Sequence, residues 1–265
     1  MKKVLIFLLV TIIISSCKET TSNEERIIPD SNGKINSVSI VIDNELWKGP
    51  VGDTIRKYLA QPVLGLPQDE PILSLSHIPT QAFEGFVRNN RTFVQIVKGE
   101  KQDFGFVQDA FASPQLGVII KGKNNEELIE AFTKNASKII NQIKRVELKE
   151  NQKRISESQL DTQRIQKQLG ININIPENYR YAKTKDNFLW IRRNIKSGHM
   201  NLLLYELPRN TINKDSILNS EIVKARDSIS KHFLEGEEEE SHYKTEGAFT
   251  PFLIETVVGG HQAYE

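Results

Sequence analysis

The feature that most constrains the fold of this chain is a run of 47 residues, Lys123–Leu169, that contains neither glycine nor proline. Asn124 or Asn125 provides a suitable N-cap for a helix, and Gly170 provides a C-terminal stop. The run therefore predicts one long helix over about residues 125–169. An unbroken helix of that length would extend about 70 Å.

Apolar residues along this predicted helix form a dense stripe in its first half and a thin stripe in its second half. The dense stripe consists of Leu128, Ile129, Phe132, Ala136, Ile139, Ile140 and Ile143. The thin stripe consists of Leu148, Ile155, Leu160, Ile165 and Leu169. We expect a packed helix to about residue 148, followed by an exposed continuation or by a second helix that folds back. The thin stripe is a solvated face or, as the alternative, a face that binds a partner.

Segments that alternate apolar and polar residues lie on both sides of the predicted helix and predict strands. They are 37–42, 72–78, 92–97, 104–107 and 116–121 before it, and 171–175, 179–183, 188–195, 200–207 and 252–258 after it. Helical spacing predicts further helices over 47–59, 81–87 and 212–234. The predicted fold class is α+β, with antiparallel sheets packed against helices and the long helix between two α+β halves.

The first seventeen residues have the composition of a secretory signal and read MKKVLIFLLVTIIISSC. Lys2 and Lys3 give a basic start, and Val4–Ile14 is a largely apolar run of eleven residues. A helix needs about 20 apolar residues to span a bilayer, so this run is too short to be a membrane span. The chain therefore carries an export signal at its start.

The end of this signal, Ile14-Ser15-Ser16-Cys17, resembles the lipobox of bacterial lipoproteins. The resemblance implies that the chain is cut before Cys17 and that its sulfur receives acyl chains such as palmitate. Two or more acyl chains hold a protein stably on a bilayer, whereas one holds it marginally. The alternative is an ordinary secretory signal with a chance cysteine, although Cys17 is the only cysteine in the chain.

The composition after the signal is that of a soluble globular body, with 38% apolar and 26% charged residues over the whole chain. Loss of Lys2 and Lys3 reduces the 35 basic residues to 33, against 34 acidic residues. A near-neutral body without a basic stripe argues against a nucleic-acid partner. Because the one cysteine is expected to carry lipid, no disulfide is predicted.

The segment after Cys17 is polar and predicts a flexible tether as far as residue 36. Glu24-Glu25 partly resembles the acidic signal that sends some Bacteroidota lipoproteins to the cell surface, and the alternative is an ordinary solvated tether. The expected parts are a signal peptide (1–16), Cys17 with its tether (17–36), an N-terminal half (37–170) and a C-terminal half (171–265). The chain stops at what looks like the start of a returning strand, so the second half is expected to be incomplete.

Eight short segments carry a resemblance to a known family. They are LPQDEP (66–71), SLSHIP (74–79), RNNRTFVQI (88–96), DAFASPQ (109–115), INIPENYRYAK (171–183), DNFLWIRR (186–193), YELP (205–208) and RDSISKHFLEG (226–236). In order and spacing they resemble the uncharacterised Bacteroidota lipoprotein family catalogued as domain of unknown function 4837, over most of the chain after the tether. The resemblance implies an envelope location and an α+β architecture, but it supplies no catalytic residues.

Two segments match catalytic motifs in part. Gly117–Lys123 fits the GxxxxGK pattern of a phosphate loop, but Asn124 replaces the required Ser or Thr and the middle of the segment is strand-like. Ser228–Lys231 has the SxxK spacing of penicillin-interacting enzymes without the partner motifs KTG and SDN. We therefore predict no catalytic residue in either segment.

Histidines and aromatic residues give weaker signals. The five histidines, at 77, 199, 232, 242 and 261, form no spaced ligand pair. His232, His242 and the Glu237–Glu240 run are a candidate divalent-metal site, with a solvated acidic loop as the favoured alternative.

The aromatic residues Trp47, Trp190, Phe83, Phe86 and Phe93 are predicted to lie in the core and not to form a sugar platform. Three Asp-Ser/Thr-Ile segments resemble the O-glycosylation signal of Bacteroidota envelope proteins: 53–55, 215–217 and 227–229.

Three functions remain open from the sequence. The first is a membrane-anchored envelope lipoprotein that acts as a protein-interaction or accessory subunit, bound to the bilayer through Cys17 and to an outer-membrane protein. The second is a glycan or small-molecule binding module, and the third is an enzyme of unrecognised type. We predict no cofactor, no metal and no nucleic-acid partner, and we favour the periplasmic face of the outer membrane over the cell surface.

Overall fold

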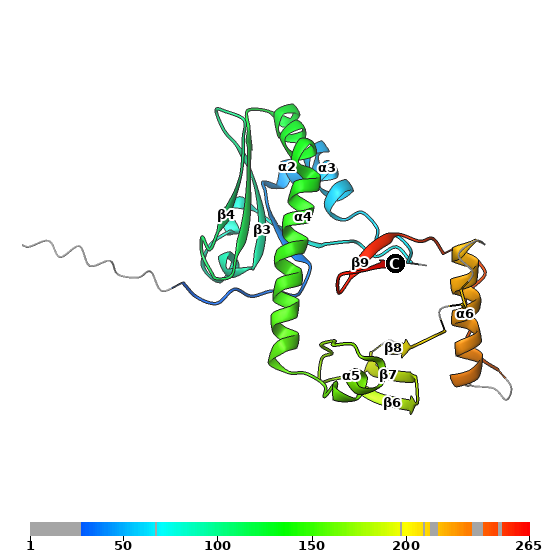
Figure 1. The fold of residues 1–265 in the computed structure, drawn as a ribbon. Coiled ribbons are helices and arrows are strands. Elements are labelled where there is room, and N and C mark those ends of the chain that lie inside the picture. The colour runs from blue at the N-terminus through cyan, green and yellow to red at the C-terminus, as the bar shows by residue number, and fades with distance from the viewer. Residues whose placement is uncertain are drawn as a thin grey trace, which may run out of the picture.

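The computed structural model describes residues 28–66, 68–196, 198–208, 210–212, 217–234, 241–248 and 251–265 (Figure 1). The predicted signal peptide, Cys17 and the Glu237–Glu240 run lie outside the described residues. Within the described ranges, no helix has both the length and the apolar character that a membrane crossing requires.

A five-stranded mixed sheet forms the centre of the N-terminal half. Its strands are β1 (Ser37–Val41), β2 (Ser74–Ile78), β3 (Thr92–Lys98), β4 (Asp103–Gln108) and β5 (Leu116–Gly122), in the order β2-β1-β3-β5-β4. β1 runs parallel to β2 and β3, β3 runs parallel to β5, and only β4 is antiparallel to its neighbour. The prediction of antiparallel sheets is therefore wrong for most of this sheet. The long connection from β1 to β2 contains a helix, which is the kind of crossover that joins parallel strands.

One face of this sheet is covered by helices and holds the main core. The helices are α2 (Asn44–Lys48), α3 (Pro50–Leu59) and α4 (Asn125–Glu157). Alternate strand residues such as Ile40, Val94 and Val118 are fully buried against this layer, together with Ile55 of α3 and Ile139 of α4. Every second residue of the strands and every third or fourth residue of the helices faces this core, as the spacing of apolar residues in the sequence predicted.

The other face of the sheet carries a smaller aromatic cluster. Phe83 and Phe93 are buried there, with ring centroids 5.1 Å apart. Phe83 lies between two short 3₁₀ turns, η2 (Thr80–Ala82) and η3 (Gly85–Asn89), where the sequence predicted a single helix over 81–87. The predicted helix is therefore wrong in type, although the chain does turn helically at this place.

The long helix α4 begins as predicted but ends earlier. The Asn124 Oδ1 accepts a hydrogen bond from the Glu127 amide at 2.9 Å, which caps the first turn. The helix ends at Glu157, and the separate helix α5 (Gln163–Leu169) follows and is closed by Gly170 at φ 65°. The prediction of one helix to about residue 169 is wrong, and the alternative of a second helix holds.

The C-terminal half contains a three-stranded antiparallel sheet beyond the end of α4 (Figure 1). Its strands are β6 (Arg180–Lys185), β7 (Phe188–Ile195) and β8 (Gly198–Tyr205), in the order β6-β7-β8. Leu189 and Ile191 of β7 pack with Ile165 of α5 in a small core. The predicted strand over 171–175 does not form, although Ile175 is buried in that same core.

The remaining elements are α6 (Leu218–Phe233) and a hairpin of β9 (Glu255–Val258) and β10 (His261–Tyr264). Phe233 at the end of α6 stacks on Phe188 of β7, with centroids 4.2 Å apart and rings 5° from parallel. The α+β fold class is confirmed.

Candidate functional site

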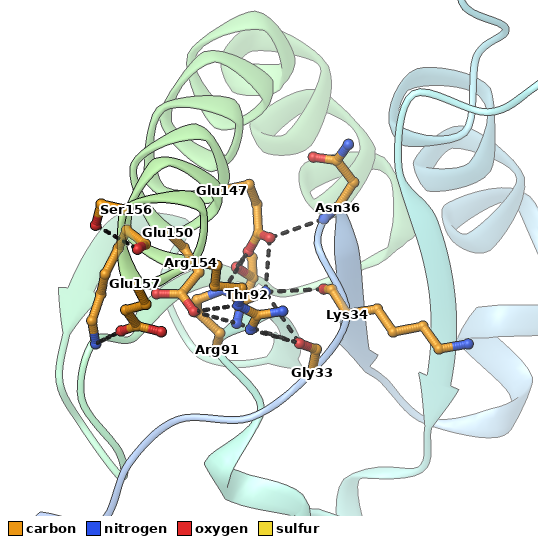
Figure 2. Close-up of polar contacts among 11 residues, drawn as sticks. Gly33, Lys34, Asn36, Arg91, Thr92, Glu147, Glu150, Arg154, Ser156 and Glu157 are labelled. Carbon is orange, nitrogen blue, oxygen red and sulfur yellow. Dashed lines mark hydrogen bonds and ion pairs between the residues drawn. The ribbon is translucent and has the colours of Figure 1, made fainter. Parts of the chain in front are cut away.

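The most buried polar site in the described residues joins Arg91, just before β3, to Glu147 of α4 (Figure 2). Both side chains are 1% exposed. The Arg91 Nε donates to Glu147 Oε1 at 3.0 Å and its Nη2 donates to Oε2 at 2.9 Å. The Thr92 hydroxyl donates to Oε1 at 2.8 Å. This two-pronged geometry is the strongest form of an ion pair between arginine and carboxylate.

The same pair holds the chain that enters the body from its N-terminal side. The Asn36 amide donates to Glu147 Oε2 at 2.9 Å, and the Arg91 Nη2 donates to the Lys34 carbonyl at 3.0 Å. The Gly33 carbonyl lies 3.4 Å from both terminal nitrogens of Arg91. The last part of the predicted tether is therefore hydrogen bonded to the interior of the protein, as Figure 2 shows.

A second layer of charge extends the network along α4. The Arg154 Nε donates to Glu150 Oε1 at 2.7 Å, and its Nη2 donates to the Gly33 carbonyl at 3.2 Å. Glu150 also lies 3.7 Å from Arg91 Nη1. Because the buried charges use their donors and acceptors on one another and on the backbone, this site serves to fix the entering chain. We name Arg91, Thr92, Glu147, Glu150 and Arg154 the junction cluster.

A crevice of about 620 Å³ lies at the carboxyl ends of β1 and β3. Its lining consists of Asp43, Asn44, Glu45, Leu46, Gly49, Pro50, Gln81, Lys98 and Asn125. In the sheet, β2 lies on one side of β1 and β3 lies on the other side of β1. The chain therefore crosses in opposite directions from β1 to β2 and from β2 to β3, and the strand order reverses at the carboxyl end of β1. Open parallel sheets bind ligands in such crevices. The crevice is therefore a candidate ligand site with a largely polar lining.

The two motif candidates from the sequence do not form active sites. Gly117–Gly122 lies inside β5 and pairs with β3 on one side and β4 on the other. Its amides therefore belong to a strand, and a phosphate loop is absent at this segment. Ser228 and Lys231 are exposed on α6, and Ser230 is buried.

The described histidines take structural roles or lie apart. His77 stacks on Trp47 with centroids 5.1 Å apart, and its Nε2 lies 3.0 Å from the Ile42 carbonyl oxygen. His232 packs edge-on against Phe233. No group of three metal-ligating residues occurs in the part of the chain that the structure describes. The acidic run of the candidate metal site lies outside that part.

Of the five aromatic residues predicted as core, three are packed in the core, whereas Trp190 is half-buried and belongs to none of the described core clusters, and Phe86 is exposed. Phe83 and Phe93 are buried, and Trp47 packs against the main core with the Arg56 guanidinium 4.4 Å from its ring centroid. Phe86 is 77% exposed, so its prediction as a core residue is wrong. It follows Gly85 in a 3₁₀ turn at the surface, where the period-based argument for a helix does not apply.

Two of the three glycosylation-like segments lie in described helices. In α3, Asp53 pairs with Arg56 at 2.6 Å and the Thr54 hydroxyl donates to the Pro50 carbonyl. In α6, the Asp227 carboxylate accepts hydrogen bonds from the Thr245 amide at 2.9 Å and hydroxyl at 2.7 Å. Partial burial raises the pKa of Asp227, but the Thr245 hydrogen bonds and the nearby Arg226 outweigh it and lower that pKa below its ordinary value. Asp215 and Ser216 lie outside the described residues.

The sequence reasoning missed a concentration of positive charge in the C-terminal half. The stretch from Arg180 to Tyr205, which forms β6, β7 and β8, contains six basic residues and one acidic residue, Asp186. The prediction of a body without a basic stripe is therefore wrong for this sheet. The segments RYAKTK and WIRRNIK were the available signal, but the near-neutral total concealed them.

Comparisons with known families divide the chain in two. Residues 31–156 match the model of a Domain of unknown function (DUF8532), and residues 158–265 match the model of a Domain of unknown function (DUF4837). The resemblance to domain 4837 is thus supported for the C-terminal part, and the four landmarks before residue 116 lie in the other match. The two matches meet where α4 ends at Glu157. No curated protein and no solved structure matches this chain.

Proposed function

We propose that this chain is a lipid-anchored protein of the cell envelope that acts as an accessory or protein-interaction subunit at the outer membrane. The anchor is the acylated sulfur of Cys17 in the lipobox-like Ile14-Ser15-Ser16-Cys17. The lipid bilayer is one partner, and an outer-membrane protein is the other. The periplasmic face is the favoured side.

The observation that carries this proposal is the way the junction cluster holds the entering chain. A body tied to a membrane by a short chain is pulled at the point where that chain enters it. Here the entering chain is first hydrogen bonded through the backbones of Pro29, Ser31 and Asn32 to the loops around Asn89 and Ser113. It is then bonded through Gly33, Lys34 and Asn36 to the buried Arg91–Glu147 pair. Both members of that pair are 1% exposed, so the hydrogen bonds that they make with the entering backbone are shielded from competing water.

The partner role is tested by crosslinking in cells. The protein is tagged at its C-terminus, crosslinked lightly, and purified from solubilised membranes together with whatever it contacts. We expect one dominant membrane protein in stoichiometric amount, and we expect the Cys17→Ala variant to lose it. A purification that enriches no protein above an untagged control would contradict the accessory role.

The crevice at the ends of β1 and β3 favours a second candidate function, the binding of a glycan or small molecule. The amides of Asn44, Gln81 and Asn125 and the carboxylate of Asp43 line it, and such planar polar groups hydrogen bond to hydroxyl groups. A panel of soluble sugars is tested by thermal unfolding. A ligand that raises Tm for the wild type but not for Asn44→Ala would support this function.

A further inference from the structure

We propose that the end of the β7–β8 hairpin docks on the phosphate headgroups of an anionic membrane surface. The docking surface, here called the hairpin end, comprises Arg180, Arg192, Arg193, Ile195, Lys196, His199 and Met200. The proposal rests on the lipid anchoring proposed above, because the anchor keeps the body close to a membrane.

The first argument is the uncompensated charge at the hairpin end. Arg180 of β6 lies directly opposite Arg192 of β7 in the strand register, so the two cations share one face of the sheet. Like charges in directly opposed strand positions are destabilising. In the described part of the chain, none of Arg180, Arg192, Arg193 and Lys196 pairs with a carboxylate. An anionic partner would relieve this repulsion.

The second argument is the way the arginines are held. The Arg192 guanidinium lies 5.6 Å from the Trp190 ring centroid, and the Arg193 guanidinium lies 5.0 Å from that of Tyr179. Contact with an aromatic ring orders a guanidinium group without consuming its charge. The Arg193 Nε and Nη2 also lie 3.2 and 2.8 Å from the Met200 sulfur, a neutral acceptor that leaves the charge of Arg193 uncompensated. Ordered guanidinium groups that do not pair with a carboxylate are suited to binding phosphate.

The third argument distinguishes a membrane from a soluble acidic partner. At the hairpin end, Ile195 is 41% exposed and Met200 is 42% exposed, next to the cations. Arg192 and His199 lie on one face of the hairpin, and Arg193 and Met200 lie on the other. The end therefore presents apolar side chains with cations on both faces. Basic groups around an exposed apolar tip match the headgroup region of an anionic bilayer.

The length of the predicted tether adds a geometric reason. Ten residues, 18–27, lie between Cys17 and Ile28, where the described structure begins. The eleven steps from Cys17 to Ile28 span at most about 40 Å when the chain is fully extended. A lipid at Cys17 would keep the hairpin end at a high effective concentration near the bilayer, so a weak patch is sufficient to orient the body.

The test uses the chain from residue 17 onward with Cys17→Ser, so that lipid plays no part. Binding is measured by co-sedimentation with phosphatidylcholine vesicles, with and without about one third of phosphatidylglycerol. We expect binding only to the anionic vesicles and a steep loss of binding as salt is added. The variant R180Q/R192Q/K196Q should bind them about tenfold or more weakly.

The matched control removes the same number of charges elsewhere. K134Q/K144Q/R145Q changes three exposed positions on α4 and should bind as the wild type does. Circular dichroism checks that each variant folds, and Lys196→Gln alone, at an exposed turn position, gives a mild second variant.

No binding to anionic vesicles, or equal loss of binding in both triple variants, would overturn the proposal. Binding to polyglutamate without binding to vesicles would overturn it in favour of an acidic protein. Because the chain tested carries no lipid, these outcomes are independent of whether Cys17 is acylated.

Discussion

Glu147 accepts hydrogen bonds from three parts of the chain: the guanidinium of Arg91, the hydroxyl of Thr92 and the amide of Asn36. A carboxylate that is 1% exposed is tolerated because these donors replace its water. At the scale of the residue, this side chain connects the long helix α4, the strand β3 and the segment that enters the body. Its loss would affect all three.

We therefore predict that Glu147→Ala lowers the free energy of unfolding by about 3–5 kcal/mol, because it leaves the Arg91 charge buried without a partner. The matched control is Glu157→Ala, ten residues further along α4. Its carboxylate pairs with Lys153 at 3.9 Å and is 62% exposed, so its loss should cost about 0.5 kcal/mol or less. Urea unfolding measures both. Equal destabilisation by the two substitutions would contradict the role given to the junction cluster.

The sequence indicated that Glu147 is buried, but it did not indicate which residue pairs with it. Glu147 lies four residues after Ile143, so it continues the dense apolar stripe of the helix and is a charged residue at a buried position. That pattern predicts a buried partner. The partner itself could not be predicted, because Arg91 is 56 residues away in sequence and only the fold brings it near.

At the scale of the element, the strand β5 is built around a close approach at Gly117. A side chain there would overlap the ring of Phe93 and the side chain of Val107, which pack on the same face of the sheet. Gly105 of the neighbouring strand β4 has open space where its Cβ would lie. The two glycines therefore form a matched pair within one sheet.

We predict that Gly117→Ala lowers the free energy of unfolding by about 1–3 kcal/mol, because the added methyl group overpacks the aromatic cluster. Gly105→Ala should be neutral or slightly stabilising, since alanine restricts the unfolded chain more than glycine does. Thermal unfolding of both variants measures the difference. Similar effects at the two positions would show that the cluster of Phe83, Phe93 and Phe111 is loosely packed.

The helix α6 is joined to the segment around Thr245 by a carboxylate with a lowered pKa. Since the pKa of Asp227 is lower in the folded protein, this interaction adds stability above the unfolded-state pKa. The added stability is lost as the pH falls through the lowered, folded-state value. We predict that an NMR titration of the Asp227 carboxyl carbon gives a midpoint below the ordinary aspartate range. The Thr245→Val variant should move that midpoint upward, and an unchanged midpoint would contradict the assignment.

The end of α4 shows why element boundaries were harder to predict than element types. Neither glycine nor proline stands between Lys123 and Leu169, so no local signal ends the helix early. The break after Glu157 coincides with long-range pairing, in which the Leu160 amide donates to the Ile175 carbonyl at 2.8 Å. Such pairing is a property of the folded chain, and it involves only Ile175 of the segment 171–175, which forms no regular strand.

At the scale of the whole molecule, α4 connects two parts that match different families. The N-terminal part has a mixed, mostly parallel sheet with a large core, whereas the C-terminal part has a small sheet with a strong positive charge. In our account, the first part secures the chain that comes from the membrane and the second part orients the molecule on that membrane. The formal net charge of the whole chain, +1, did not indicate that positive charge is concentrated in the second part.

The central claim is that Cys17 anchors the protein, and the most direct test is the intact mass of the protein purified from salt-washed membranes. The account predicts a chain that begins at Cys17 and carries the added mass of two or three acyl chains. It also predicts that the chain from residue 17 with Cys17→Ser, which has neither the signal nor the lipid, is removed from anionic membranes by a high-salt wash, because salt screens the charges of the hairpin end. An unmodified N-terminus on the membrane-bound protein, or retention of that Cys17→Ser chain after the wash, would contradict the claim.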